Sequence, residues 1–127
     1  MYFGILLERV KAVDGNMPET VRVYWDRGVS VPRRRAETHK GDYGKVLLLC
    51  GSEGLTGAAR LAAKAALRTG SGLVYLGVPE KIYPIVAAAS GSEIVFPLPC
   101  DGKGRLSLAA LEPIGARMEA MDAVLLG

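Results

Sequence analysis

Residues 45–78 read KVLLLCGSEGLTGAARLAAKAALRTGSGLVYLGV, and their pattern indicates the class of fold. It begins with a continuous apolar run at residues 45–50, which is typical of a parallel strand buried on both faces. A loop with several glycines follows, and residues 57–70 then have the alanine and leucine content of a helix. A second apolar run at residues 73–78 predicts a second strand. This order is typical of a helix that connects two parallel strands.

The same alternation continues to the end of the sequence. We expect a short helix, a third strand, a helix interrupted by a proline, and a fourth strand, at residues 79–89, 93–98, 106–121 and 122–127. Pro79 is expected to start the first of these helices and Pro84 to kink it, while Pro113 interrupts the second. The prediction is therefore an α/β fold with a parallel sheet and helices on both faces.

The helix at residues 57–70 has recognisable ends. Thr56 is the predicted N-cap and Gly70 the predicted left-handed stop. Basic residues recur every four positions along it, at Arg60, Lys64 and Arg68, and this stripe is expected to face solvent. Because the other side chains of the helix are almost all apolar, we expect the rest of its circumference to be buried.

The two ends of the chain differ in pattern. Residues 1–30 are interpreted as an extension or linker with a short strand at residues 21–25, and residues 31–127 as the domain, entered by an ordered loop. The sequence stops at Gly127, directly after an apolar strand. Ligands of open α/β sheets bind where strands end. We therefore expect this chain to be the first half of a larger, three-layer α/β/α domain.

Composition excludes several classes of protein. The chain has 127 residues, half of them hydrophobic and 23% charged, which suits one folded domain. The net charge is +3, and the basic residues are scattered apart from residues 33–35. A nucleic-acid-binding domain usually has a denser basic face with aromatic residues, so no nucleic-acid partner is expected. No segment approaches about 18 consecutive apolar residues, so no membrane span is expected either.

The cysteines and the histidine argue against a metal site. Cys50 and Cys100 are far apart, no CxxC motif is present, and His39 is the only histidine. These residues do not make a zinc site, and no metal ligand is predicted. Cys50 is the last residue of an apolar run, and this position predicts a buried free thiol. Two unpaired cysteines favour a reducing compartment, and the cytoplasm is predicted.

The glycine loop does not fit the common nucleotide motifs. Its glycines follow the spacing GxxGxxG at Gly51, Gly54 and Gly57, and Glu53 stands where GxGxxG requires glycine. An acidic side chain there would repel a pyrophosphate. Only Glu80, placed roughly where a ribose-binding acid would follow the second strand, agrees with a dinucleotide site. A P-loop is excluded because alanine, rather than lysine, follows the last glycine.

No nucleophile–base set is apparent in the sequence. There is no GxSxG elbow, and His39 and Asp42 are more readily interpreted as parts of a turn. What remains at residues 51–58 is a loop of small residues before a helix. Small residues let a ligand approach the backbone, and a helix N-terminus offers N–H donors. The alternative is that the small residues serve only to pack the strand against the helix.

Two elements together resemble a known family. They are HKGDYG at residues 39–44 and GSEGLTGA at residues 51–58, with Arg34 upstream and DAVLLG at residues 122–127. Over residues 34–127 the sequence resembles the ADP/ATP-dependent NAD(P)H-hydrate dehydratases, the YjeF C-terminal domain family, which has a ribokinase-like fold. In the family the last of these strands runs into a glycine-proline-glycine loop, of which this sequence has the first glycine.

The resemblance implies a lyase that repairs damaged nicotinamide cofactors. In such enzymes hydrated NADH or NADPH loses water, because ATP or ADP phosphorylates the added hydroxyl and the phosphate then leaves, typically with Mg²⁺. The resemblance assigns Ala58 as a substrate contact with Gly57 and Thr56 beside it, and Gly127 as the start of a second substrate loop. The relatives form oligomers, so a homo-oligomer is expected.

The resemblance also implies what this sequence does not contain. The family's nucleotide-binding segment and its glycine-threonine-glycine-aspartate motif belong to the second half of the domain. No catalytic residue is therefore expected in this chain, and turnover by the chain alone is not expected. Two alternatives stay open: a ribokinase-like kinase acting on a small hydroxylated substrate, and a non-enzymatic module that self-associates.

Overall fold

A four-stranded parallel sheet organises the part of the chain that the structure describes. The computed structural model describes residues 34–127. The strands are β1 (Lys45–Leu49), β2 (Leu73–Pro79), β3 (Ile94–Leu98) and β4 (Ala123–Leu126). β1 pairs in parallel with both β2 and β4, and β2 pairs in parallel with β3. The predicted parallel α/β sheet is confirmed, whereas the extension at residues 1–30 and its strand lie outside the described residues.

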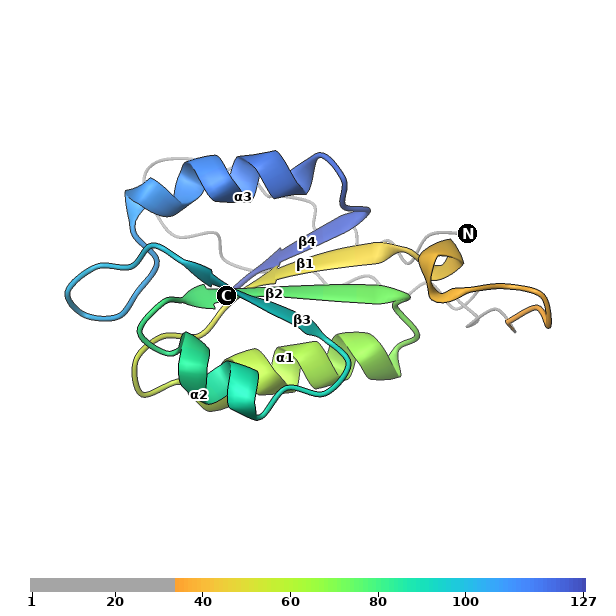
Figure 1. Ribbon diagram of the computed structural model, residues 1–127, viewed down its shortest axis with the longest axis horizontal. Helices are drawn as coiled ribbons and strands as arrows, with labels where there is room; N and C mark the ends of the chain where they lie inside the picture. The colour runs from red at the N-terminus through yellow and green to blue at the C-terminus, as the bar shows by residue number, and fades with distance from the viewer. Residues whose placement is uncertain (1–33) are drawn as a thin grey trace, which may run out of the picture. The chain divides into compact units, whose positions relative to one another are not determined.

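Helices cover both faces of the sheet, as predicted. α1 (Thr56–Arg68) and α2 (Tyr83–Ala88) lie on one face, and α3 (Leu111–Met118) lies on the other (Figure 1). Two short 3₁₀ turns complete the described chain: η1 (Lys40–Tyr43) precedes β1, and η2 (Leu108–Ala110) leads into α3. No helix within residues 34–127 is long and apolar enough to cross a membrane.

Alternate residues of the strands feed two hydrophobic cores. On the α1 side, Leu48 and Leu76 pack among the buried side chains of Ala59, Ala63 and Val86. Burial of each large apolar side chain contributes about 1.5–3 kcal/mol to the free energy of folding. Because successive side chains of a strand point to opposite faces, a strand that serves two cores must be apolar at every position.

The second core lies under α3. Leu47, Leu49 and Phe96 pack there against Ala110 and Ile114. The Arg117 guanidinium lies 4.3 Å from the centre of the Phe96 ring, a cation–π contact that covers the outer side of this core.

Pro97 lies within β3, where a proline needs a special position. β3 bonds to β2 alone among the described strands, so one side of β3 carries no ladder bonds. Proline has no N–H to donate, and within sheets it is tolerated at such edges.

The HKGDYG turn lies at the amino-terminal ends of the strands and holds them together through hydrogen bonds. His39 caps η1, since its Nδ1 accepts a hydrogen bond from the Gly41 N–H at 3.1 Å. The His39 N–H donates to the Asp42 carboxylate at 2.9 Å, which completes a capping box. The interpretation of His39 and Asp42 as parts of a turn is therefore confirmed. The turn lies before β1, at the opposite edge of the sheet from the loop that follows β1.

Asp122 ties β4 to β1 beside this turn. Its Oδ2 accepts from the Lys45 N–H at 2.7 Å, and its own N–H donates to the Lys45 carbonyl at 2.9 Å. These two bonds fix the register in which β4 begins.

Gly72 allows the η1 turn to approach β2. Its N–H donates to the carbonyls of Tyr43 and Gly44, both at 3.1 Å. A methyl group built on Gly72 would lie 1.7 Å from the Lys40 carbonyl oxygen, which is backbone and has little room to move. Glycine is therefore required at this position for steric reasons.

Four local expectations are wrong. The N-cap of α1 is Leu55, and Thr56 is already helical with no side-chain cap bond. Pro79 ends β2, and Pro84 lies in the first turn of α2, where a missing N–H costs nothing. Pro113 likewise lies in the first turn of α3, so it helps to start that helix after η2 and does not interrupt it.

α1 is also less buried than the sequence suggests. Ala59 and Ala63 are its fully buried residues, whereas Leu61 is 70% exposed. α1 therefore meets the sheet along one narrow stripe, as positions four apart on a helix do. The basic stripe at Arg60, Lys64 and Arg68 is exposed, as predicted, and Gly70 follows the helix with φ +99°, as a left-handed stop.

We expect Gly72→Ala to lower the free energy of unfolding by about 3 kcal/mol, because the methyl group would overlap a backbone carbonyl. Gly115→Ala is the control, because Gly115 is an exposed helical residue with open space around it. That change should stabilise the chain by about 0.5–1 kcal/mol. Urea denaturation of both variants measures the difference. Equal stability of the two variants would contradict the steric requirement at Gly72.

Candidate functional site

Because the four strands are parallel, their carboxyl-terminal ends lie at the same end of the sheet, and the segments that follow the strands meet there. This end is called the carboxyl edge below. Residues 51–55 follow β1 and lead into α1. Gly51 has φ +92° and Gly54 has φ +82°, so this loop needs glycine at both turns. A methyl group on Gly51 would lie 3.0 Å from the Ala59 Cβ and 3.2 Å from the Ile82 Cδ1. The loop is therefore packed tightly against α1 and against the segment that follows β2.

The predicted substrate contacts lie at the start of α1. Thr56 is half-buried, and Gly57 and Ala58 are exposed. The Ala58 N–H donates to the Leu55 carbonyl at 3.2 Å, which closes the first turn. No side chain of the described residues caps this helix. The start of α1 therefore has no side-chain cap, and two small residues, Gly57 and Ala58, are exposed there.

Gly127, the fourth predicted contact, lies at the end of β1 next to the same loop. Its N–H donates to the Leu49 carbonyl at 3.0 Å, and a methyl group on Gly127 would lie 3.9 Å from the Cys50 Cβ. The parallel pairing of β4 with β1 causes this proximity, because both strands end at the same level. The structure thus brings Gly127 to the sheet edge that also carries the start of α1.

A group of residues that the sequence does not single out surrounds the loop. The Glu53 N–H donates to the Gly104 carbonyl at 3.1 Å. The Lys81 Nζ donates to the Gly102 carbonyl at 2.7 Å and lies 3.4 Å from the Glu53 Oε2. The loop after β1 and the turn after β3 are thus joined by a lysine from the segment after β2. Glu53, interpreted from the sequence as an obstacle to phosphate binding, has a cationic partner.

Residues 101–105 form a stiff turn beside this group. The Asp101 carboxylate accepts hydrogen bonds from the N–H groups of Lys103 and Arg105, both at 2.9 Å, and pairs with the Arg105 guanidinium at 2.8 Å. The hydrogen bonds from Arg105, chiefly its backbone N–H, lower the pKa of Asp101. These contacts all join residues of the turn itself, so the turn is held together without contacts from the loop after β1.

This meeting of loops follows from the strand order. β2 lies between β1 and β3, so the residues that follow β2 lie between the other two loops. The sequence predicts the strands but not their lateral order, so nothing in the sequence indicated that Lys81 lies between the other two loops. The useful signal was the coincidence of charged residues just after three neighbouring strands, at Glu53, Lys81 and Asp101.

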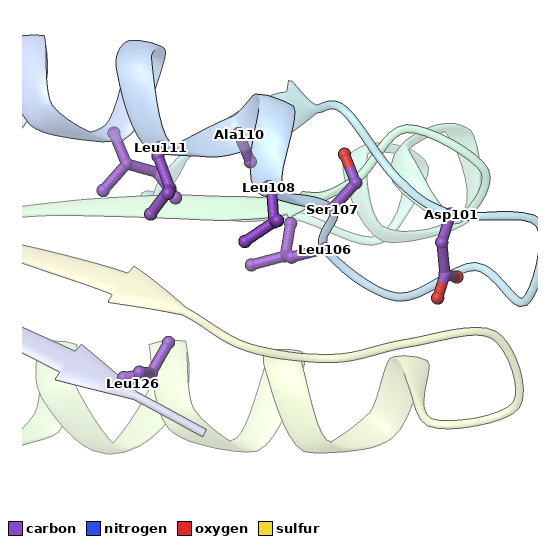
Figure 2. Close-up of a pocket in the computed structure, with 8 residues that line it drawn as sticks. Asp101, Leu106, Ser107, Leu108, Ala110, Leu111 and Leu126 are labelled. Atoms are coloured by element: carbon purple, nitrogen blue, oxygen red, sulfur yellow. The ribbon is translucent and has the colours of Figure 1, made fainter.

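An apolar hollow lies on the other side of the sheet. It has a volume of about 480 Å³, and Figure 2 shows Leu108 and Leu111 facing Leu126 across it. Asp101 and Ser107 are the polar residues at its wall. None of the predicted substrate contacts lines it. We therefore assign the candidate site to the loop before α1.

The described residues offer little for metal or nucleophilic chemistry. Within residues 34–127 no group of three or more His, Cys, Asp or Glu side chains lies close enough together to hold a metal ion. Burial raises the pKa of the Cys50 thiol, which disfavours the reactive thiolate. His39 lies at the far edge of the sheet. What this edge offers is a shaped surface with backbone donors.

Comparison with known proteins agrees with this architecture. The carbohydrate kinase family model described as NAD(P)H-hydrate dehydratase matches residues 46–127. A bifunctional NAD(P)H-hydrate repair enzyme Nnr from Moorella thermoacetica is 44% identical over 103 residues, which are 81% of this chain and 19% of that protein. An ADP-dependent (S)-NAD(P)H-hydrate dehydratase from Bacillus subtilis is 46% identical over 57 residues, which are 45% of this chain and 21% of that protein.

The matched region contains β1 except its first residue, all of β2, β3 and β4, the loop before α1, and Gly127. The chain spans about a fifth of the length of these relatives. Since the family model covers more than half of the chain, the chain belongs to the NAD(P)H-hydrate dehydratase family, as its sequence resemblance indicates.

Proposed function

We propose that this protein takes part in the repair of NAD(P)H hydrate, and that residues 51–58 with Gly127 form one wall of the hydrate site. The observation that carries the proposal is the uncapped start of α1, where Gly57 and Ala58 are exposed at the strand ends. The names of the relatives, which act on NAD(P)H hydrate, support the same substrate.

The wall suits a ligand that binds through shape and polar atoms. Glycine and alanine allow ligand atoms to approach the backbone, and the helix start directs N–H groups and a partial positive charge outward. NAD(P)H hydrate carries hydroxyl, amide and phosphate oxygens that accept such bonds. The chain's own residues would bind and orient the hydrate, and none of them is proposed to exchange a proton with it.

The energy source is proposed to be ATP or ADP with Mg²⁺. The Bacillus subtilis relative is named as ADP-dependent, which supports ADP. Phosphorylation of the added hydroxyl would turn it into a better leaving group. Residues 34–127 contain no P-loop sequence and no group of three or more His, Cys, Asp or Glu side chains that could hold a metal ion. We propose that the nucleotide site and the catalytic aspartate belong to a part of the domain outside this chain.

A ribokinase-like kinase is the second candidate, because the matching family model is itself named for carbohydrate kinases. The two activities differ in the fate of the phosphate. A kinase leaves it on the substrate, whereas the dehydratase releases it with loss of the hydroxyl. Testing NADPH hydrate and a set of hydroxylated small molecules as substrates distinguishes the two activities, because a phosphorylated product indicates a kinase and released phosphate indicates a dehydratase.

Self-association and the cytoplasmic setting are also part of the proposal. β4 is exposed along its length, with Val124 and Leu125 each more than two-fifths exposed. Such an edge favours pairing with another chain, which also keeps the non-enzymatic alternative open. Cys50 and Cys100 are both free, as expected in a reducing compartment. Light scattering measures the oligomeric state, and a monomer would contradict the expected homo-oligomer.

We expect the purified 127-residue chain to bind NADPH hydrate without converting it. Binding is measured by isothermal titration calorimetry, and conversion by the return of the dihydronicotinamide absorbance with ATP or ADP and Mg²⁺ present. Binding without conversion is expected because the chain offers a wall but no catalytic aspartate. Turnover at ordinary enzyme rates would show that the chain contains catalytic groups. Absence of binding would contradict the proposal that residues 51–58 and Gly127 form a wall of the hydrate site.

A larger side chain at Ala58 should block the wall. We expect Ala58→Leu to weaken hydrate binding at least tenfold, or about 1.4 kcal/mol, because the new side chain would occupy the ligand's space. Leucine and alanine have similar helix propensities, so stability should change little. Ala65→Leu is the control, because Ala65 is also an exposed alanine and lies later in α1. Equal affinities of the two variants would place the hydrate elsewhere.

A further inference from the structure

We propose that Lys81 is a positioning residue for the hydrate site, holding residues 51–55 against the turn at residues 101–105. The inference rests on the proposed function, because the loop that Lys81 holds leads into the proposed substrate wall. Lys81 would act through the loop, without contacting the hydrate.

The contacts of Lys81 span two segments that are far apart in sequence. Its Nζ donates to the Gly102 carbonyl at 2.7 Å and pairs with the Glu53 carboxylate at 3.4 Å. The first contact has good hydrogen-bond geometry, and the second is a looser ion pair. One ammonium group therefore reaches both the loop after β1 and the turn after β3.

Lys81 closes over a backbone contact that is already tight. The Glu53 N–H donates to the Gly104 carbonyl at 3.1 Å. Gly104 has φ +66°, and a methyl group built on it would lie 2.6 Å from the Glu53 Cβ. Glycine at this position lets the two backbones meet, and Lys81 joins the same two segments from the side.

The position of Glu53 is transmitted to the start of α1. The Leu55 N–H donates to the Ser52 carbonyl at 2.9 Å, and the Ala58 N–H donates to the Leu55 carbonyl. Gly54, between them, has φ +82° and no neighbour within 4 Å of its built Cβ. The loop therefore turns in open space, and its contact at Glu53 helps to set where the helix begins.

The same contacts contribute little to global stability. The Lys81 and Glu53 side chains are 44% and 62% exposed, and ion pairs at such sites are screened by water. Removing the lysine should change the local order of the loop much more than it changes the unfolding transition. This separation lets a positioning role be distinguished from a general structural one.

The first experiment measures amide hydrogen exchange by NMR in the full 127-residue chain. We expect Lys81→Met to speed exchange at the Glu53 and Leu55 amides about fivefold, with the unfolding midpoint nearly unchanged. Lys81→Arg should restore most of the protection. Lys103→Met is the matched control: it also removes one lysine charge, from the turn that Lys81 contacts, and Lys103 makes no side-chain hydrogen bond or ion pair within residues 34–127. Equal exchange in Lys81→Met and Lys103→Met would overturn the proposal.

Glycine variants of the turn test the same contact from its other side. Gly104→Ala should also speed exchange at Glu53, because its methyl group would push the loop away. Gly102→Ala is the control, because a methyl group there meets nothing within 4 Å. If Gly104→Ala leaves the Glu53 amide as protected as Gly102→Ala does, the loop does not depend on this turn.

The second experiment measures NADPH-hydrate affinity by titration. We expect Lys81→Met to weaken binding about fivefold, Glu53→Gln to weaken it less, and the double variant to match Lys81→Met, because both act on one contact. If Lys81 binds the hydrate directly, Glu53→Gln leaves affinity intact or improves it, and the positioning role is wrong. If the wild-type chain binds no hydrate, the proposed function fails, and the exchange result alone decides whether Lys81 orders the loop.

Discussion

β1 is buried on both faces, and this double burial determines how the other elements pack around it. β1 bonds to β2 on one side and to β4 on the other, and its side chains enter both cores. A strand in this position has no polar face, which explains the unbroken run of valine and leucine. The chain emerges from this buried strand directly into the loop before α1, which is the proposed binding wall.

The two edges of the sheet have different tasks. At the amino edge, the HKGDYG turn, Gly72 and Asp122 lock the beginnings of three strands through backbone hydrogen bonds and a steric fit. At the carboxyl edge, small residues leave a surface open. The most recognisable motif of the sequence thus mainly holds the strands together, whereas the proposed binding wall includes three positions with little or no side chain, Gly57, Ala58 and Gly127.

The sequence predicted the parts that depend on local pattern. Strand positions followed from apolar runs, and the left-handed glycine after α1 followed from its place at the helix end. The errors arose where tertiary context decides. Thr56 is not the N-cap, because the turn closed by Leu55 starts the helix one residue earlier. Pro79 stays in β2, because its place at the strand end requires no N–H. The exposure of Leu61 depends on how much of α1 the sheet covers.

Glu53 illustrates what pattern alone does not predict. Considered along the sequence, it is a negative charge within a loop of glycines, and it argues against a phosphate site. In the fold, its carboxylate lies 3.4 Å from the Lys81 ammonium, and its backbone is bonded to the turn after β3. The charge is therefore partly neutralised, and the residue joins the loop to its neighbours. Because the ion pair is exposed and weak, it can set the loop's position while adding little to stability. Only the lateral order of the strands brings these residues together, and that order is absent from any local stretch of sequence.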